Sequence, residues 1–215
     1  MNSDPRSDNH PQSSIGRRPK VAALGAILAV LALAASACSP ATASPTQPLY
    51  TEVPIGATPW PAGTVGQYGL HIDPSLLGKL PSNVDAYQIV EDADADLLAL
   101  DDADLPKTFD RYLSARIGQV GDDNWLILAV GHLTATAGDD AYPAWVDQFD
   151  SEACSQASGV GTSGTETINF WEVDTAKCGG GPVVYTLQLQ DDIVVSMFGY
   201  GPRDLGRQLI EAIYN

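Results

Sequence analysis

From residue 66 onward, apolar and polar positions alternate in ways that predict strands and helices. Residues 86–91 alternate and predict a strand, and residues 92–100 predict a short helix that opens on acidic residues. A longer helix is predicted to begin at Asp104, its N-cap, and to reach residue 117. Its apolar residues recur at i, i+4, i+7 and i+8, and Gly118 follows.

The second half of the domain predicts more strands than helices. Residues 124–133 are a near-continuous apolar run and predict a central strand that is buried on both sides. The remaining elements are, in order, a helix at 141–158, strands at 167–173, 183–190 and 193–200, and a helix at 203–214. Asp191 and Asp192 fall between two of these strands and predict a tight hairpin turn.

This order of elements predicts the fold class. Three consecutive strands late in the chain imply antiparallel pairing, because adjacent strands with short connections form hairpins. We therefore expect an α+β domain with two layers: a largely antiparallel sheet of about five strands, with the helices packed on one face.

The first part of the chain has the pattern of an export signal. Arg17, Arg18 and Lys20 precede an apolar run at residues 21–35, which is shorter than the roughly 20 residues of a membrane-spanning helix. We expect residues 1–37 to be a cleaved signal peptide. Residues 38–63 are rich in Pro, Thr, Ala and Ser and predict an extended tether. Residues 64–215 then form one globular domain.

Residues 33–38, Leu-Ala-Ala-Ser-Ala-Cys, resemble the lipobox of bacterial lipoproteins, although the family most often has Leu where Ala35 stands. The resemblance implies that Cys38 becomes the acylated N-terminus and anchors the chain to the cell membrane on its extracytoplasmic face. Export by the general secretory route and by the twin-arginine route both stay open. An uncleaved anchor with an unmodified Cys38 is the alternative, and it gives the same orientation.

The cysteine count agrees with this placement. The chain has three cysteines, and if Cys38 carries lipid, Cys154 and Cys178 are left. Outside the cytoplasm such a pair most simply forms a disulfide. It would tie the end of the third helix to the turn before the last hairpin.

The charge of the chain excludes one class of partner. Residues 38–215 contain seven Lys and Arg and 25 Asp and Glu, which gives a formal net charge of −18. This excludes nucleic-acid binding through a basic surface, and docking onto anionic lipid through a polybasic patch. The acidity favours solubility, and it also leaves a cation or a basic partner open.

Two motifs bear on metal or cofactor binding. Asp92, Asp94 and Asp96 could supply oxygen ligands to a cation such as Ca²⁺, but the spacing does not fit an EF-hand loop, and a solvated helix face is the alternative. Residues 159–164 match G-x-G-x-x-G, but they follow a helix instead of opening one, so a flexible loop is expected. The sequence predicts no cofactor.

Catalysis would depend on few residues. His132 and His71 are the histidines left after export, and His132 could act as a base near the end of the buried strand. We expect a non-catalytic binding, sensing or envelope-associated module, whose partner would be a protein or a small ligand. An exported hydrolase that uses His132 is one alternative. The other is an accessory subunit that docks a basic partner through its acidic surface.

Overall fold

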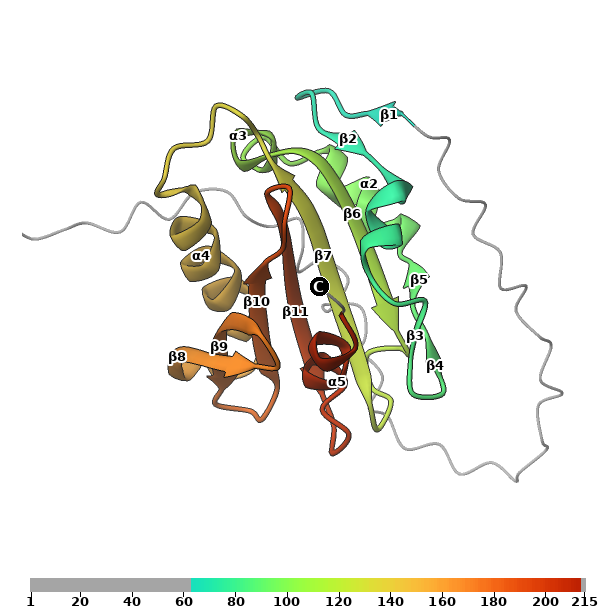
Figure 1. Cartoon of the computed structure of the whole chain (residues 1–215), viewed down its shortest axis with the longest axis vertical. Coiled ribbons are helices and arrows are strands. Elements are labelled where there is room, and N and C mark those ends of the chain that lie inside the picture. The colour runs from blue at the N-terminus through green and yellow to red at the C-terminus, as the bar shows by residue number, and fades with distance from the viewer. Residues whose placement is uncertain (1–62, 214–215) are drawn as a thin grey trace, which may run out of the picture.

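A computed structural model describes residues 63–213 of the chain. The predicted signal peptide, Cys38 and nearly all of the tether lie outside the described residues. Figure 1 shows the long strands running side by side through the middle of the domain. Within residues 63–213, no helix combines the length and the hydropathy needed to cross a membrane.

The described residues contain a nine-stranded sheet, ordered β1-β2-β6-β7-β11-β10-β9-β8, with β5 paired to β6. Its long strands are β6 (Phe109–Ile117), β7 (Trp125–Leu133), β8 (Val160–Ile168), β9 (Trp171–Cys178), β10 (Val183–Gln188) and β11 (Ile193–Tyr200). Its short strands are β1 (Thr64–Val65), β2 (His71–Ile72) and β5 (Val90–Glu91), and β3 (Asn83–Val84) pairs separately with β4 (Tyr87–Gln88). The helices are the 3₁₀ helix η1 (Pro74–Lys79), α2 (Ala93–Leu100), α3 (Leu105–Thr108), α4 (Ala141–Ser155) and α5 (Leu205–Ala212).

The predicted α+β class is confirmed, but the expected sheet of about five strands is too small. The sheet is also mixed, because β2 runs parallel to β6 while the other pairs are antiparallel. The additional strands come from residues 64–91, where short segments of two residues each add to the β6 side of the sheet. Such short strands leave almost no periodic signal in the sequence.

The expectation that all helices pack on one face is wrong. Trp145 of α4 donates a hydrogen bond from Nε1 to Oγ of Ser196 on β11 (2.8 Å), and Ser196 pairs with Thr186 on β10. The residue before Thr186, Tyr185, points to the opposite face, since neighbouring side chains on a strand alternate. Its hydroxyl donates to Asp204 at the start of α5 (2.8 Å). The sheet is therefore covered by α4 on one face and by α5 on the other.

The predicted helix at 104–117 is also wrong. Only Leu105–Thr108 is helical, and the chain then continues as strand β6. Both faces of β6 are buried, so its apolar residues do not alternate with polar ones and happen to match a helical spacing.

Most of the remaining predicted elements are confirmed with small shifts. They are α2, β7, α4, β10, β11 and α5. Asp191 and Asp192 both have positive φ values (60° and 56°), as the predicted hairpin turn between β10 and β11 requires. Two expectations fail: the strand predicted at 167–173 spans the β8–β9 turn at Asn169, and the loop predicted at residues 159–164 belongs mostly to β8.

Candidate functional site

The predicted pair of cysteines is joined. Cys154 at the end of α4 and Cys178 at the end of β9 form a disulfide, with their Cα atoms 5.1 Å apart. Both residues are buried, so the bond fixes the helix on one face of the sheet. Cys38 lies outside the described residues.

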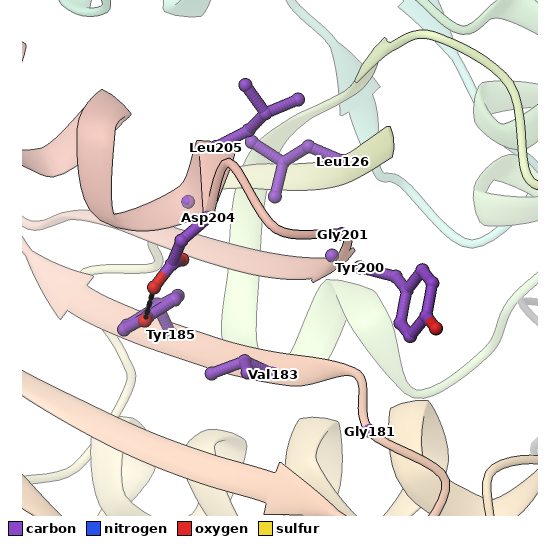
Figure 2. Close-up of a pocket in the computed structure, with 10 residues that line it drawn as sticks. Leu126, Gly181, Val183, Tyr185, Tyr200, Gly201, Asp204 and Leu205 are labelled. Atoms are coloured by element: carbon purple, nitrogen blue, oxygen red, sulfur yellow. Dashed lines mark hydrogen bonds between the residues drawn. The ribbon is translucent and has the colours of Figure 1, made fainter. Parts of the chain in front are cut away.

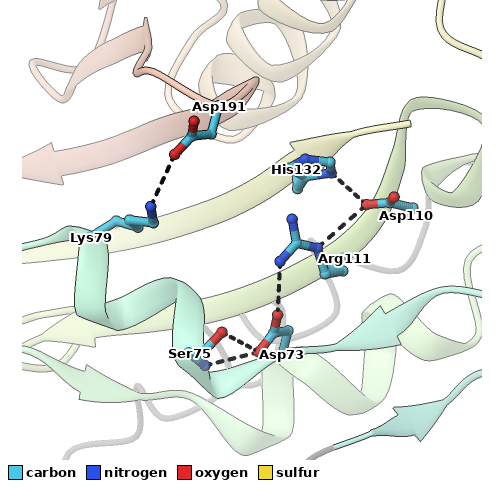
Figure 3. A network of polar contacts seen from close by, with 7 residues as sticks. All are labelled: Asp73, Ser75, Lys79, Asp110, Arg111, His132 and Asp191. Atoms are coloured by element: carbon cyan, nitrogen blue, oxygen red, sulfur yellow. Dashed lines mark hydrogen bonds and ion pairs between the residues drawn. The ribbon is translucent and has the colours of Figure 1, made fainter. Parts of the chain in front are cut away.

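His132, the predicted base, has an acidic partner. Nδ1 of its ring lies 2.7 Å from Oδ1 of Asp110, and the side chain of His132 is 23% exposed (Figure 3). Arg111 approaches the same oxygen, with its Nε atom 3.7 Å from Oδ1 of Asp110 (Figure 3). Nη1 of Arg111 also reaches Oδ2 of Asp73, at 3.4 Å. These residues form a continuous polar network at one end of the sheet.

The second histidine lies in the same part of the fold. Strand pairing places His71 on β2 opposite Arg111 on β6, and Arg111 opposite His132 on β7. Paired residues on neighbouring strands share a face, so these three side chains form a row across the sheet. The two histidines of residues 38–215 thus flank one arginine, an arrangement that the sequence conceals because β6 has the apolar spacing of a helix.

Asp73 is the best-anchored acid of this network. The hydroxyl and the backbone N–H of Ser75 both donate to Oδ1, at 2.6 Å and 3.0 Å. Burial raises the pKa of Asp73, but these hydrogen bonds and the charge of Arg111 outweigh it, so that its pKa lies below its usual value. Asp73 therefore stays ionised and holds Arg111 in place.

This network has only part of what a hydrolase needs. A carboxylate on Nδ1 orients an imidazole and leaves Nε2 as a base, which is the arrangement of a catalytic His–Asp pair. In residues 63–213, however, no hydroxyl or thiol side chain hydrogen-bonds to the His132 ring. Among these residues, the base and its orienting acid are present, and no nucleophile is hydrogen-bonded to the ring.

The three predicted metal ligands are separated by the fold. Asp92 caps α2 by accepting from the N–H of Ala95 and pairs with Arg116, while Asp94 is exposed. Asp96 is completely buried and accepts a hydrogen bond from the N–H of Ser114, at 2.6 Å. Within the described part of the chain, no three His, Cys, Asp or Glu side chains come together as metal ligands.

Asp92 and Asp94 instead line a hollow of about 290 Å³ between the start of α2 and the ends of β6 and β7. One side of the hollow is charged, because Arg116 reaches Oδ2 of Asp92 at 3.4 Å. The lining also includes apolar residues, among them Trp125 and Ile127. An apolar surface with a few convergent polar groups is typical of a small-ligand site, and the volume suits a small molecule. This hollow is the candidate binding site.

A second hollow, of about 80 Å³, lies where β10 and β11 meet the start of α5 (Figure 2). Four glycines line it, and Tyr185 donates to Asp204 at its side. Asp204 also caps α5 by accepting from the N–H of Arg207. In this hollow the Tyr185 hydroxyl and the Asp204 carboxylate are therefore bonded to one another. The volume is also too small for most ligands. We interpret this hollow as part of the packing between the sheet and α5, and not as a binding site.

Comparisons with known proteins found no matching family model, no similar curated protein and no similar solved structure. The site is therefore interpreted from its own geometry.

Proposed function

We propose that this chain is a membrane-anchored lipoprotein whose extracytoplasmic domain is a non-catalytic binding module. The observation that carries the proposal is the Cys154–Cys178 disulfide. Structural disulfides persist in oxidising compartments and are rare in the cytosol. With these two cysteines joined, Cys38 is the remaining cysteine of the sequence, which fits its predicted acylation.

The hollow beside Trp125 supports binding as the role of the domain. It offers an aromatic surface for an apolar group and the Arg116–Asp92 pair for a polar group. The His132–Asp110 pair, in contrast, contacts no described nucleophile. The hollow can therefore hold a ligand, and no nucleophile among the described residues is hydrogen-bonded to His132 to react with it.

The anchor is tested by mass spectrometry of the chain extracted from membranes. We expect a mature chain that begins at an acylated Cys38, together with a Cys154–Cys178 peptide pair. Replacing Cys38→Ser should abolish the acylated N-terminal peptide, while Ser39→Ala should leave it in place. A wild-type chain that still begins upstream of Val21, or free thiols at both later cysteines, would contradict the proposal.

The His132–Asp110 contact of 2.7 Å favours the exported hydrolase as a second candidate. A panel of chromogenic esters and phosphoesters distinguishes the two candidates. If the domain is non-catalytic, the wild type and the His132→Gln variant give the same background rate. Turnover in the wild type that is lost in His132→Gln, but not in His71→Gln, would favour the hydrolase.

A further inference from the structure

One edge of the sheet is a long strand whose outer side is unpaired. Strand β8 ends the strand order, and no other strand in the described part of the chain pairs with the side that faces away from β9 (Figure 1). Ile168 and Trp171 flank a two-residue turn, so they form a hydrogen-bonded pair. Since such pairs alternate along the strands, Ser163, Thr165 and Thr167 direct their backbone N–H and C=O groups away from β9. This edge can therefore accept the backbone of another strand.

Strand β8 lacks the features that usually protect an edge strand. Protected edges are short, or they carry proline, lysine or inward-pointing charges. Strand β8 has nine residues, contains neither proline nor lysine, and has Glu166 as its one charged residue. A bulge lies at its start, between Val160 and Thr162, and its pairing with β9 is regular from there onward. Its first six residues are exposed, so α4 and α5 leave space beside it on both faces.

The lysine beside this edge has no acidic partner within its own copy. Thr162 on β8 pairs with Lys177 on β9, so the two side chains share a face of the sheet. Lys177 is exposed, and none of the ion pairs in residues 63–213 includes it. The other Lys and Arg of these residues each have an Asp or Glu partner: Lys79, Lys107, Arg111, Arg116, Arg203 and Arg207. An unpaired lysine therefore lies next to an unpaired strand.

We propose that two copies of this domain pair through β8, with the two strands antiparallel and a twofold axis at Gly164. Such a contact is self-complementary, so each interaction occurs twice. In this register Thr162 of one copy lies opposite Glu166 of the second copy, and Lys177 follows in the same row, one strand further. Two strand spacings are about 10 Å, which the two long side chains can span between them. Glu166 thus gains a cation besides Arg207, and Lys177 gains an acid.

The charges select this register over its neighbours. A register centred on Thr165 would place Glu166 opposite Gly164 of the second copy and out of line with Lys177. The register centred on Gly164 also places Ser163 opposite Thr165 of the second copy, and hydroxyl pairs of this kind stabilise antiparallel strands. At the axis the two glycines face each other, and a Cβ atom there would have no neighbour within 4 Å in its own copy.

Pairing through β8 goes beyond the proposed binding role and does not depend on it. The hollow beside Trp125 is formed by α2, β6 and β7, which lie away from this edge. An interface of two strand edges is small, and both copies are acidic, so the association is weak. At about 0.15 M salt the repulsion is screened beyond about 8 Å, which leaves the local pairs to determine the contact.

Cysteine cross-linking of the full chain in its membranes tests the pairing and its register. In Gly164→Cys the two new thiols face each other in a non-hydrogen-bonded pair, with Cα atoms about 4.5 Å apart, which a disulfide can bridge. Oxidation with copper phenanthroline should give a covalent dimer on non-reducing gels, and peptide mapping should join position 164 of both copies. Gly138→Cys, in an exposed turn with equal space around it, should give about tenfold less dimer. In Thr162→Cys the new thiols lie about 13 Å apart along the paired strands and should give as little.

Charge reversal tests the two rows that contain Lys177. In the Gly164→Cys background, Lys177→Glu places like charges in both rows and should slow cross-linking about tenfold. Lys107→Glu makes the same change of net charge on α3, and should slow it less than about twofold because salt screens distant charges. Adding Glu166→Lys to Lys177→Glu restores opposite charges in each row and should recover part of the rate.

Three results would contradict the proposed pairing. Equal yields of dimer in Gly164→Cys and Gly138→Cys would mean that β8 does not meet a second copy. An equal yield in Thr162→Cys would mean that the strands collide without a fixed register. Equal slowing by Lys177→Glu and Lys107→Glu would mean that net charge, and not the row through Lys177, determines the association.

Discussion

At the scale of single residues, Asp96 is a buried carboxyl group whose pKa is strongly raised. The sequence predicts a metal ligand at this position, but Asp96 lies on the buried side of α2. Its Oδ1 accepts from the N–H of Ser114, and its Oδ2 has no hydrogen-bond partner among the described residues. Burial raises the pKa of Asp96 to about 7 from 3.8. An acid with a raised pKa binds its proton more tightly in the folded state than in the unfolded state.

The sign of the pH dependence follows directly. Between pH 4 and pH 7 the folded state holds more protons than the unfolded chain, so the contribution of Asp96 to stability falls as the pH rises. Asp96→Asn removes this titration and keeps an oxygen for Ser114. We expect its stability relative to the wild type to be greater at pH 8.5 than at pH 5.5, by on the order of 2 kcal/mol, and the two proteins to match only below about pH 4.

Urea unfolding at the two pH values measures this difference. Asp94→Asn, on the exposed side of the same helix, is the matched control for removing one carboxylate from α2. Glu152 and Asp150 also have raised pKa values. Both titrate in the wild type and in the variant, so their contributions to the pH dependence cancel in the comparison. If Asp96→Asn is less stable than the wild type by the same amount at both pH values, Asp96 is ionised and stabilising in the fold.

At the scale of elements, the sequence predicts those whose surroundings agree with their local pattern. Helix α2 begins where Asp92 caps it, and β7 is the continuous apolar run that a central strand requires. Strand β6 escapes prediction because it is covered on both faces. Its buried residues include Tyr112, Leu113, Ser114 and Ala115 in succession, so period-two alternation is lost. Tertiary pairing with β7 decides its conformation.

Strand β8 escapes prediction for the opposite reason. Its residues are mostly exposed, so they show no apolar face, and its conformation depends on hydrogen bonds to β9. The candidate sites are predictable only in part for the same reason: strand pairing, and not local pattern, brings their residues together. The sequence singles out His132, but it assigns Asp110 and Arg111 to a helix. It also singles out Asp92 and Asp94 as a group, but the hollow beside Trp125 depends on the β6–β7 pairing.

The packing of α4 onto this pair of strands makes Gly131 sensitive to substitution. A Cβ atom at Gly131 on β7 would lie 2.4 Å from the ring of Phe109 on β6. That ring is buried and meets Trp145 of α4 edge-on, at 4.8 Å between ring centroids. Because Trp145 is held by Ser196, the ring has little room to move. We expect Gly131→Ala to lower the free energy of unfolding by about 1–3 kcal/mol.

Denaturant unfolding tests this, with Gly138→Ala as the matched control. A Cβ atom at Gly138 would meet no neighbouring side chain or backbone within 4 Å, so this replacement should be nearly neutral. The double variant Gly131→Ala with Phe109→Leu should recover part of the loss, because the smaller side chain leaves space for the methyl group. If Gly131→Ala is as neutral as Gly138→Ala, the Phe109 ring is not fixed against β7.

At the scale of the whole molecule, helices on both faces explain how so acidic a domain builds a core. The sheet is buried from two sides, and the core includes Leu126 and Val195 with almost no exposed surface. The disulfide adds a link between α4 and the sheet across 24 residues of sequence. Closing a loop of this size stabilises the folded state by roughly 3 kcal/mol in the chain-entropy model. Both contributions oppose the repulsion among the surface charges.

That repulsion predicts how the stability of the molecule depends on salt. Residues 63–213 contain seven Lys and Arg and 24 Asp and Glu, and folding brings these charges closer together. Screening shortens the range of repulsion from about 30 Å at 0.01 M salt to less than 10 Å above 0.1 M. The ion pairs of the surface, such as Lys79–Asp191, are exposed and weaken with salt, but such pairs contribute at most about 1 kcal/mol each.

We expect repulsion to outweigh the ion pairs, and the melting temperature therefore to rise between 0.01 M and 0.5 M NaCl. A gain of about 1 kcal/mol corresponds to about 2–4 °C for a chain of this size. Calorimetry in NaCl and KCl measures the rise, and the two salts should agree if screening is the cause. Sulfate, which also strengthens apolar burial, should give a larger rise. A lower melting temperature in 0.5 M NaCl would mean that the ion pairs stabilise the fold more than its net charge destabilises it.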